Sequence, residues 1–507
     1  MGLEALMLKL ATARRAPAAS LLLHGIGGIH VSLSTLALVG AVVVNAALAV
    51  AVPSSLWTIS ALLLYGLALA RLGAAQPGAL FMLAPFVVLH VAMMVSLVGI
   101  ESGALMGEIG LTGHASPAGA LYVVYALIFI GTAAAVLRQL EPQGTQVSSG
   151  RAAGAHWILC WAGFAIAGGA AGYLFLAGLR TGFPLLMGAD RLLFRASGAD
   201  IVTLNLLNLK HTIAAAAGVG AAFAKNGGVR YAHHGAFGLF LAASFLYGDK
   251  FFIIVIASCF YFMPFVLRDA GGVARTVKRA TPVLALVLFS MSIVTYYIYS
   301  EEGARSHEET MDRLSQRVAG QGQLWFAAVG DSSEAFSFDV RQVTLNLGSL
   351  VANPGAVYVL EHRIAAFYFI ERYAPTTMHR SFVKNGGAVT PTMVLEAYGL
   401  LLFGFVGLAV LLALIGAGIG VLLHCLRVAM LSANPINALL PAFVCAQAIV
   451  FVAQATLYSL LSPSAFKAYA AFLVLQLAVA AYLRRLSPIN DWARHDPPPR
   501  RLRRAGS

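Results

Sequence analysis

The chain has 507 residues, of which 59% are hydrophobic and 11% are charged, and its formal net charge is +13. Soluble domains carry about 25% charged residues, so this composition excludes a soluble globular protein and indicates a polytopic membrane protein. Much of the positive charge, including the tail 500–504, lies where the cytoplasmic face of a bilayer would attract it. We therefore do not expect nucleic acid as a partner.

Apolar runs long enough to cross a bilayer recur along the chain and predict an all-α protein with about twelve transmembrane helices. Nine precede residue 300, at 34–52, 54–72, 78–100, 117–137, 155–179, 201–224, 232–247, 251–267 and 281–299. Three follow, at 394–427, 436–461 and 466–483. The run 394–427 is too long for one upright span, and Phe403-Gly404-Phe405 near its start predicts a bend or a tilted entry.

This pattern divides the chain into four parts: transmembrane helices in 1–300, a polar cap in 301–392, further transmembrane helices in 393–483 and a basic tail in 484–507. Both termini are expected in the cytoplasm, because this topology places most of the loop arginines and lysines inside. The same topology places the cap outside. We predict that the cap is mostly helical.

The cap begins with a stretch of helix-forming composition at 308–319, which places Arg313 and Arg317 one turn apart on one face. Two guanidinium groups in this arrangement suit a phosphate or pyrophosphate. Gly320 and Gly322 would end the helix and bring backbone close to a ligand. The alternative is that Glu309 pairs with Arg313 and the face is only solvated.

Other polar residues near the helices extend this set. Gln321, Gln323 and Trp325 follow the cap helix, and the flat indole is a surface on which a sugar ring can stack.

Further cations lie on the outer side or within the membrane. Arg191 and Arg195 lie four residues apart in a short loop next to the membrane, and Lys210 and His211 lie inside the run 201–224. Ionisable groups at that depth are expensive unless they face a cavity or a partner, so Lys210 is either functional or part of a structural ion pair. Lys250, at the end of its run, either contacts the ligand or extends to the interface.

At the C-terminal end of the cap, Thr390-Pro391 predicts the start of the next helix. Glu396 and Tyr398 would then lie in the first turns of that helix. A carboxylate at this depth suits a general base that takes a proton from a sugar hydroxyl. Glu396 could equally be a structural partner of Lys210 or Arg317. His379 and His211 are further candidates for the acid–base role.

No nucleotide-binding pattern occurs, and all four cysteines lie in apolar segments rather than in the cap. We therefore expect no cofactor and no metal site.

The segments 387–398 and 403–407 resemble the region after the large external loop of Wzy-type oligosaccharide repeat-unit polymerases, such as O-antigen polymerases. The stretch Leu246-Tyr247-Gly248-Asp249-Lys250 is similar to that family's Gly-Ser-Arg stretch, with Asp-Lys in place of Ser-Arg, and 313–325 is similar to its arginine- and glycine-bearing loop.

The resemblance implies a glycosyltransferase of the bacterial inner membrane with a periplasmic cap. It would join glycans linked to undecaprenyl pyrophosphate, as donor and acceptor, without nucleotide or metal, and a chain-length regulator would be a protein partner. The residues expected to bind pyrophosphate are Arg191, Arg195, Lys210, Lys250, Arg313 and Arg317. Those expected to act on or position the glycan are Glu396, His379, His211, Gln321, Gln323, Trp325 and Tyr398.

Two other functions fit the same sequence. One is a transporter, either a lipid-linked oligosaccharide flippase or an anion carrier, although no pair of similar halves is found. The other is the related O-antigen ligase, which joins glycan to the lipid A core.

Overall fold

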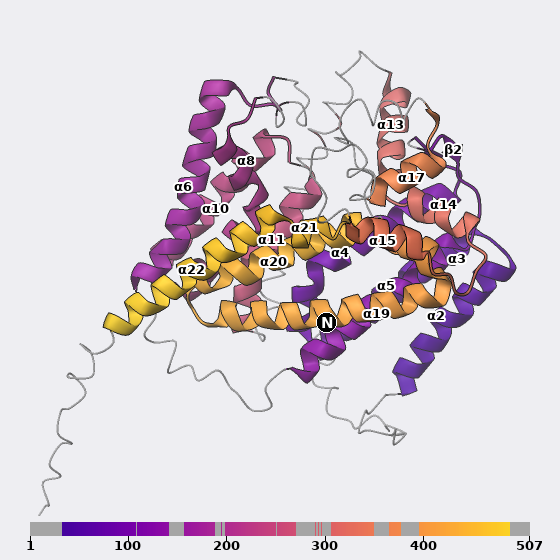
Figure 1. The fold of residues 1–507 in the computed structure, drawn as a ribbon, viewed down its shortest axis with the longest axis horizontal. Coiled ribbons are helices and arrows are strands. Elements are labelled where there is room, and N and C mark those ends of the chain that lie inside the picture. The colour runs from indigo at the N-terminus through magenta and orange to yellow at the C-terminus, as the bar shows by residue number, and fades with distance from the viewer. Residues whose placement is uncertain are drawn as a thin grey trace, which may run out of the picture.

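A computed structural model of the chain describes residues 33–107, 109–140, 157–187, 198–249, 251–269, 306–348, 365–376 and 395–486, together with Phe194, Phe289, Ile293 and Tyr296. Within these residues, eight helices are long and apolar enough to cross a membrane, or nine if one bent pair forms a single span. The eight are α2 (Leu33–Ala51), α3 (Ser55–Ala75), α4 (Pro77–Glu101), α5 (Ala118–Gln139), α6 (Trp157–Thr181), α19 (Leu395–Leu431), α20 (Pro435–Gln454) and α22 (Pro463–Leu486). The chain is thus an all-α polytopic membrane protein (Figure 1).

The predicted spans in the middle of the chain differ most from the structure. The run 201–224 forms two helices, α8 (Ile201–Asn208) and α9 (Lys210–Phe223), bent by 62° at Leu209. It is followed by α10 (Gly227–Leu246) and the shorter apolar helix α11 (Phe251–Arg268). The predicted span 281–299 lies outside the described residues except at three positions. The count of twelve therefore stays a prediction.

Small residues set how closely the membrane helices approach. Helix α19 packs along α5, where a Cβ added at Gly416 would lie 2.5 Å from the carbonyl oxygen of Phe129 and one at Gly420 would lie 2.7 Å from that of Ala133. Glycines four residues apart allow this close backbone contact. In lipid the hydrophobic effect contributes little to helix association, so such close packing is what holds the two helices together.

The described part of the cap, residues 306–348 and 365–376, contains α13 (His307–Ala319), α14 (Gln323–Asp331), α15 (Val340–Gly348) and α17 (Ala365–Tyr373). Helix α13 matches the predicted helix 308–319: Ser306 caps it by accepting from the Glu309 amide at 3.3 Å, and Gly320 follows its end. A short hairpin of β1 (Leu105–Met106) and β2 (Leu111–Thr112) joins α4 to α5. Figure 1 shows α13, α14, α17 and β2 gathered on one side of the helix bundle.

The cap is anchored to the membrane helices at α4. The Ser96 hydroxyl donates to the Ala319 carbonyl at 2.9 Å and accepts from the Gly322 amide at 2.8 Å. A Cβ at Gly322 would lie 2.9 Å from that hydroxyl oxygen, so only glycine allows this approach.

A second anchor is the predicted bend in α19. Gly404 has φ 69° and ψ −177°, which interrupts the helix and frees its backbone groups. The segment 334–339 of the cap satisfies these backbone groups with four hydrogen bonds. The Ser337 amide donates to the carbonyl of residue 403, and the Asp339 amide donates to that of residue 402. In return, the amide of residue 405 donates to the carbonyl of residue 334, and the amide of residue 406 donates to that of residue 335. The break therefore joins the cap to α19.

Candidate functional site

The first turn of α19 carries a carboxylate that is buried beneath the cap. Glu396 is 2% exposed and faces residues from two other membrane helices. The Tyr122 hydroxyl of α5 donates to its Oε1 at 3.2 Å, and Nε2 of His90 on α4 lies 3.6 Å from the same oxygen. The Tyr65 hydroxyl of α3 lies 3.4 Å from the other ring nitrogen, Nδ1, of His90. We call these four residues the acid–histidine cluster.

The acid–histidine cluster is not fully hydrogen-bonded. Among the described residues, neither Glu396 Oε2 nor His90 Nε2 has a hydrogen-bond partner. Burying a carboxyl group without full hydrogen bonding is costly, which makes this an unusual position for a glutamate. The His90 ring is in contact with the carboxyl but does not hydrogen-bond to it. The cluster thus combines two ionisable side chains with a carboxyl oxygen, Oε2, that has no partner among the described residues.

The cap closes over this cluster with Trp325 of α14. The indole N–H donates to the Ala118 carbonyl at 2.7 Å, and the ring packs edge-on against Tyr122 and Tyr125, with centroids 5.7 and 5.6 Å away. Trp325 is fully buried, as is Gln323, and Tyr398 is 6% exposed against the aromatic rings of α17. These three predicted glycan contacts thus present no open surface in this structure, because the packing of α14 and α17 on the spans covers them.

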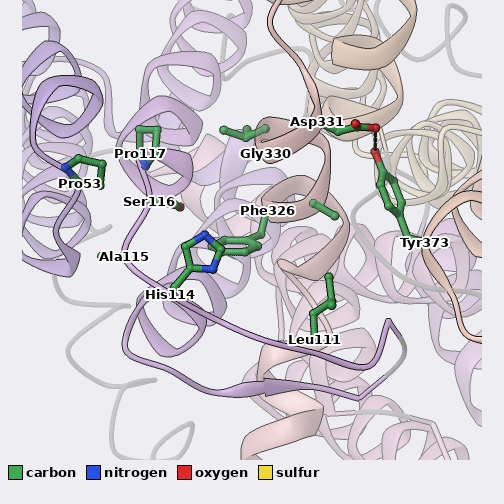
Figure 2. Close-up of a pocket in the computed structure, with 12 residues that line it drawn as sticks. Pro53, Leu111, His114, Ala115, Ser116, Pro117, Phe326, Gly330, Asp331 and Tyr373 are labelled. Atoms are coloured by element: carbon green, nitrogen blue, oxygen red, sulfur yellow. Dashed lines mark hydrogen bonds between the residues drawn. The ribbon is translucent and has the colours of Figure 1, made fainter.

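A pocket of about 520 Å³ lies beside α14, against the residues that follow Trp325 in that helix (Figure 2). Its walls come from the α2–α3 turn, the connection between β2 and α5, and helices α14 and α17 of the cap. The lining residues are Pro53, Leu111, His114, Ala115, Ser116, Pro117, Phe326, Ala327, Val329, Gly330, Asp331 and Tyr373.

A second buried carboxylate lies under this pocket. Glu101, at the end of α4, accepts hydrogen bonds from Thr58 at 2.5 Å, from the lining residue Ser116 at 3.2 Å and from the Gly119 amide at 2.8 Å. All three donors are neutral. Glu101 therefore fixes the start of α5 and the position of Ser116.

Charged residues at the rim of the pocket are paired with one another. Asp331 Oδ2 accepts from Arg372 Nε at 2.8 Å, from Arg372 Nη2 at 2.5 Å and from the Tyr373 hydroxyl at 3.0 Å. Burial raises the pKa of Asp331, but the hydrogen bonds from Arg372 and Tyr373 outweigh it and hold that pKa below its ordinary value. Burial and the bond to Asp331 raise the pKa of Tyr373.

The predicted cations are not gathered around this pocket in the described part of the chain. Lys210 is buried and its Nζ lies 2.5 Å from Asp249 Oδ2, so the structural ion pair considered from the sequence is present. Arg313 and Arg317 are exposed on α13, as the helical spacing predicts. His211 follows Lys210 in α9, and its ring packs against Phe260 with centroids 5.6 Å apart. Gln321 is half-buried between α13 and α14.

Four predicted site residues, Arg191, Arg195, Lys250 and His379, lie outside the described residues, as does the predicted helix start at Thr390-Pro391. Their roles stay predictions.

Sequence reasoning missed the partners of Glu396. His90 and Glu101 are polar residues in or at the end of an otherwise apolar run, and such residues in membrane spans are expensive and often functional. That signal was available for both. No local signal brings Tyr65, Tyr122 or the pocket residue Asp331 to the site, because each reaches it through contacts between distant segments.

Residues 361–467 match the model of a family of unknown function, DUF6418. This segment includes Glu396, the break at Gly404 and all of α20. No curated protein and no solved structure matches the chain.

Proposed function

We propose that the protein is a metal-independent glycosyltransferase that polymerises polyprenyl-pyrophosphate-linked oligosaccharide repeat units on the periplasmic face of a bacterial inner membrane. The observation that carries the proposal is the acid–histidine cluster, in which Glu396 lies beneath the cap with a histidine in contact and one carboxyl oxygen unpartnered among the described residues. The position of Glu396 at the start of a membrane run suggested a general base, with a structural partner of Lys210 or Arg317 as the alternative. The surroundings of Glu396 support the role of base.

In the proposed reaction, a hydroxyl oxygen of the acceptor glycan attacks the anomeric carbon of the donor. The new carbon–oxygen bond forms as the bond from that carbon to the pyrophosphate oxygen breaks, and the pyrophosphate leaves with the bonding pair on its polyprenyl carrier. Glu396 takes the hydroxyl proton, and Tyr122 and His90 hold its carboxyl group in place. Because Trp325 and α14 cover the cluster, substrate entry requires α14 to move from Ala118.

The leaving pyrophosphate needs cationic stabilisation, which arginine side chains can provide. Arg313 and Arg317 are one turn apart and exposed on α13, next to the point where Ala319 is anchored to α4. Lys210 is less suited to this role in the proposal, because Asp249 already holds its ammonium group.

The experiment is elongation in detergent. Purified protein is supplied with lipid-linked repeat units extracted from cells that lack this gene, and products are separated by length. We expect a ladder of longer lipid-linked glycans without any membrane gradient. Arg317→Ala should lose the ladder, whereas Arg341→Ala, an exposed arginine of α15, should keep it. Absence of elongation by the wild-type protein, with the substrate shown to be intact, would reject a polymerase.

A transporter is the second candidate, because two features resemble transport pathways. The pair α8 and α9 is bent by 62° in the middle of an apolar run, with the ion pair of Lys210 and Asp249 beside the bend. Buried acid and histidine side chains in spans also occur in proton relays. A transporter would move lipid-linked glycan across vesicles and would show no elongation in detergent. A ligase would instead transfer the glycan to added lipid A core.

A further inference from the structure

The residues that line the pocket beside α14 restrict the charge of a possible ligand. Of its twelve lining residues, none is lysine or arginine, and the one carboxylate among them, Asp331, is already paired with Arg372. The Glu101 carboxyl lies directly behind Ser116. A diphosphate needs several positive donors, and this pocket offers it two nearby carboxyl groups instead. The lining therefore disfavours an anionic ligand.

The lining also offers the groups that hydroxyl-rich rings need. The exposed His114 imidazole stands edge-on to Phe326, with ring centroids 5.1 Å apart, and Tyr373 lies at the opposite wall (Figure 2). Asp331 Oδ1 accepts no hydrogen bond from the residues that the structure describes, and Ser116 contributes a hydroxyl. Aromatic faces with a few fixed polar groups are typical of small-ligand sites, whose volumes run from about 300 to 1,000 Å³.

The position of the pocket argues against a lipid chain. Its walls are connections at the ends of spans and cap helices: Pro53 precedes α3, and Ser116 and Pro117 precede α5. The pocket thus lies at the end of the bundle that the cap covers. A buried isoprenoid would instead require an apolar surface between spans.

A short chain of contacts connects the pocket to the acid–histidine cluster. Ser116 accepts from the Ala118 amide, the Ala118 carbonyl accepts from Trp325, and Trp325 packs on Tyr122, which donates to Glu396. Phe326 lines the pocket, and the preceding residue on α14, Trp325, covers the cluster. The pocket is thus connected to Glu396 through two side chains, those of Trp325 and Tyr122.

We propose that this pocket binds neutral sugar residues of the glycan near the acid–histidine cluster. The pyrophosphate and the lipid chain of the same substrate would lie outside this pocket. This assignment rests on the proposed function for its substrate class. It differs from the predicted glycan contacts Gln323, Trp325 and Tyr398, which are buried.

Gly330 provides a direct test, because it lines the pocket and a Cβ added there meets no atom within 4 Å. Gly330→Phe would add a ring at the pocket wall, at a position where its Cβ meets no neighbouring atom. The matched control is Gly348→Phe at the end of α15, where a Cβ also meets nothing within 4 Å and which does not line the pocket. His114→Ala is a second, milder change at an exposed position.

The probe is a set of neutral oligosaccharide fragments made by partial acid hydrolysis of the host's own surface polysaccharide, titrated into purified protein by calorimetry. We expect Gly330→Phe to weaken binding at least about tenfold and Gly348→Phe to change it less than about twofold. His114→Ala should weaken it severalfold, and sodium pyrophosphate should not compete. Unchanged binding in both pocket variants, absent binding by the wild-type protein, or competition by pyrophosphate would overturn the assignment.

The two proposals fail separately. If wild-type protein binds the fragments but elongates nothing, the polymerase proposal is rejected and the sugar-site proposal stands. If wild-type protein elongates and Gly330→Phe elongates with the same KM, the polymerase proposal stands and the sugar-site proposal is rejected.

Discussion

Replacing Gly404 by alanine tests whether the cap is held to the membrane helices through the break in α19. At φ 69° and ψ −177°, Gly404 occupies a backbone region that is essentially restricted to glycine, and a side chain there costs about 1–3 kcal/mol. The added Cβ would also lie 2.8 Å from the carbonyl oxygens of both Glu334 and Ala335. Because these are backbone atoms, the segment itself must move.

That movement threatens the hydrogen bonds that these two carbonyls accept from residues 405 and 406. At about 0.5–1.5 kcal/mol for each bond, the total expected loss in the free energy of unfolding is about 2–6 kcal/mol. Gly418→Ala is the matched control, since it lies in the same helix and its Cβ meets nothing within 4 Å.

The assay is thermal unfolding of detergent-purified protein, combined with limited proteolysis at the cap. Gly404→Ala should melt at a clearly lower temperature than wild type and expose the segment 334–339 to cleavage. Gly418→Ala should melt at or slightly above the wild-type temperature, because alanine favours helix. Equal melting temperatures and equal cleavage in the two variants would show that the break does not anchor the cap.

Three further predictions follow from contacts in the structure. Lys210→Met should destabilise the protein by about 3–5 kcal/mol in the same unfolding assay, because it leaves the buried Asp249 carboxylate without its ammonium partner. The double variant Lys210→Met/Asp249→Leu should recover most of this loss, because it removes both charges. Arg317→Lys should lower elongation in detergent, because an ammonium group cannot replace a bidentate guanidinium, and a rate equal to wild type would exclude a bidentate contact. The pKa of Asp331 is held below its ordinary 3.8, so its stabilising effect is present above that pH and is lost as pH falls through the lower folded-state value. The melting-temperature difference between wild type and Asp331→Asn should therefore be largest near neutral pH and shrink in acid, and a difference that grows in acid would contradict the ion pair with Arg372.

Local features were predictable from the sequence. The helix at 308–319 follows from composition and from the glycines after it, and the bend at Gly404 follows from a run too long for one upright span. Both depend on residues close together in the chain. The cap helix begins one residue earlier than expected, at His307, because Ser306 caps it.

Features that depend on distant contacts were not predictable. The sequence left Lys210 as either a ligand or an ion-pair residue, and the choice of Asp249 as its partner depends on how α9 lies against the turn after α10. Trp325 was expected to face a sugar, yet the packing of α14 on α5 turns its indole toward Ala118. Leu209 carries no glycine or proline signal for the 62° bend that follows α8.

The role of Glu396 is tested most directly by the elongation ladder of Glu396→Gln. Glutamine keeps the size of the side chain and can still accept from Tyr122, but it cannot take a proton from a sugar hydroxyl. The control is Glu308→Gln, an exposed glutamate of α13. We predict that Glu396→Gln inserts and purifies like wild type and forms no ladder, while Glu308→Gln forms a normal one. A normal ladder from Glu396→Gln would contradict the account.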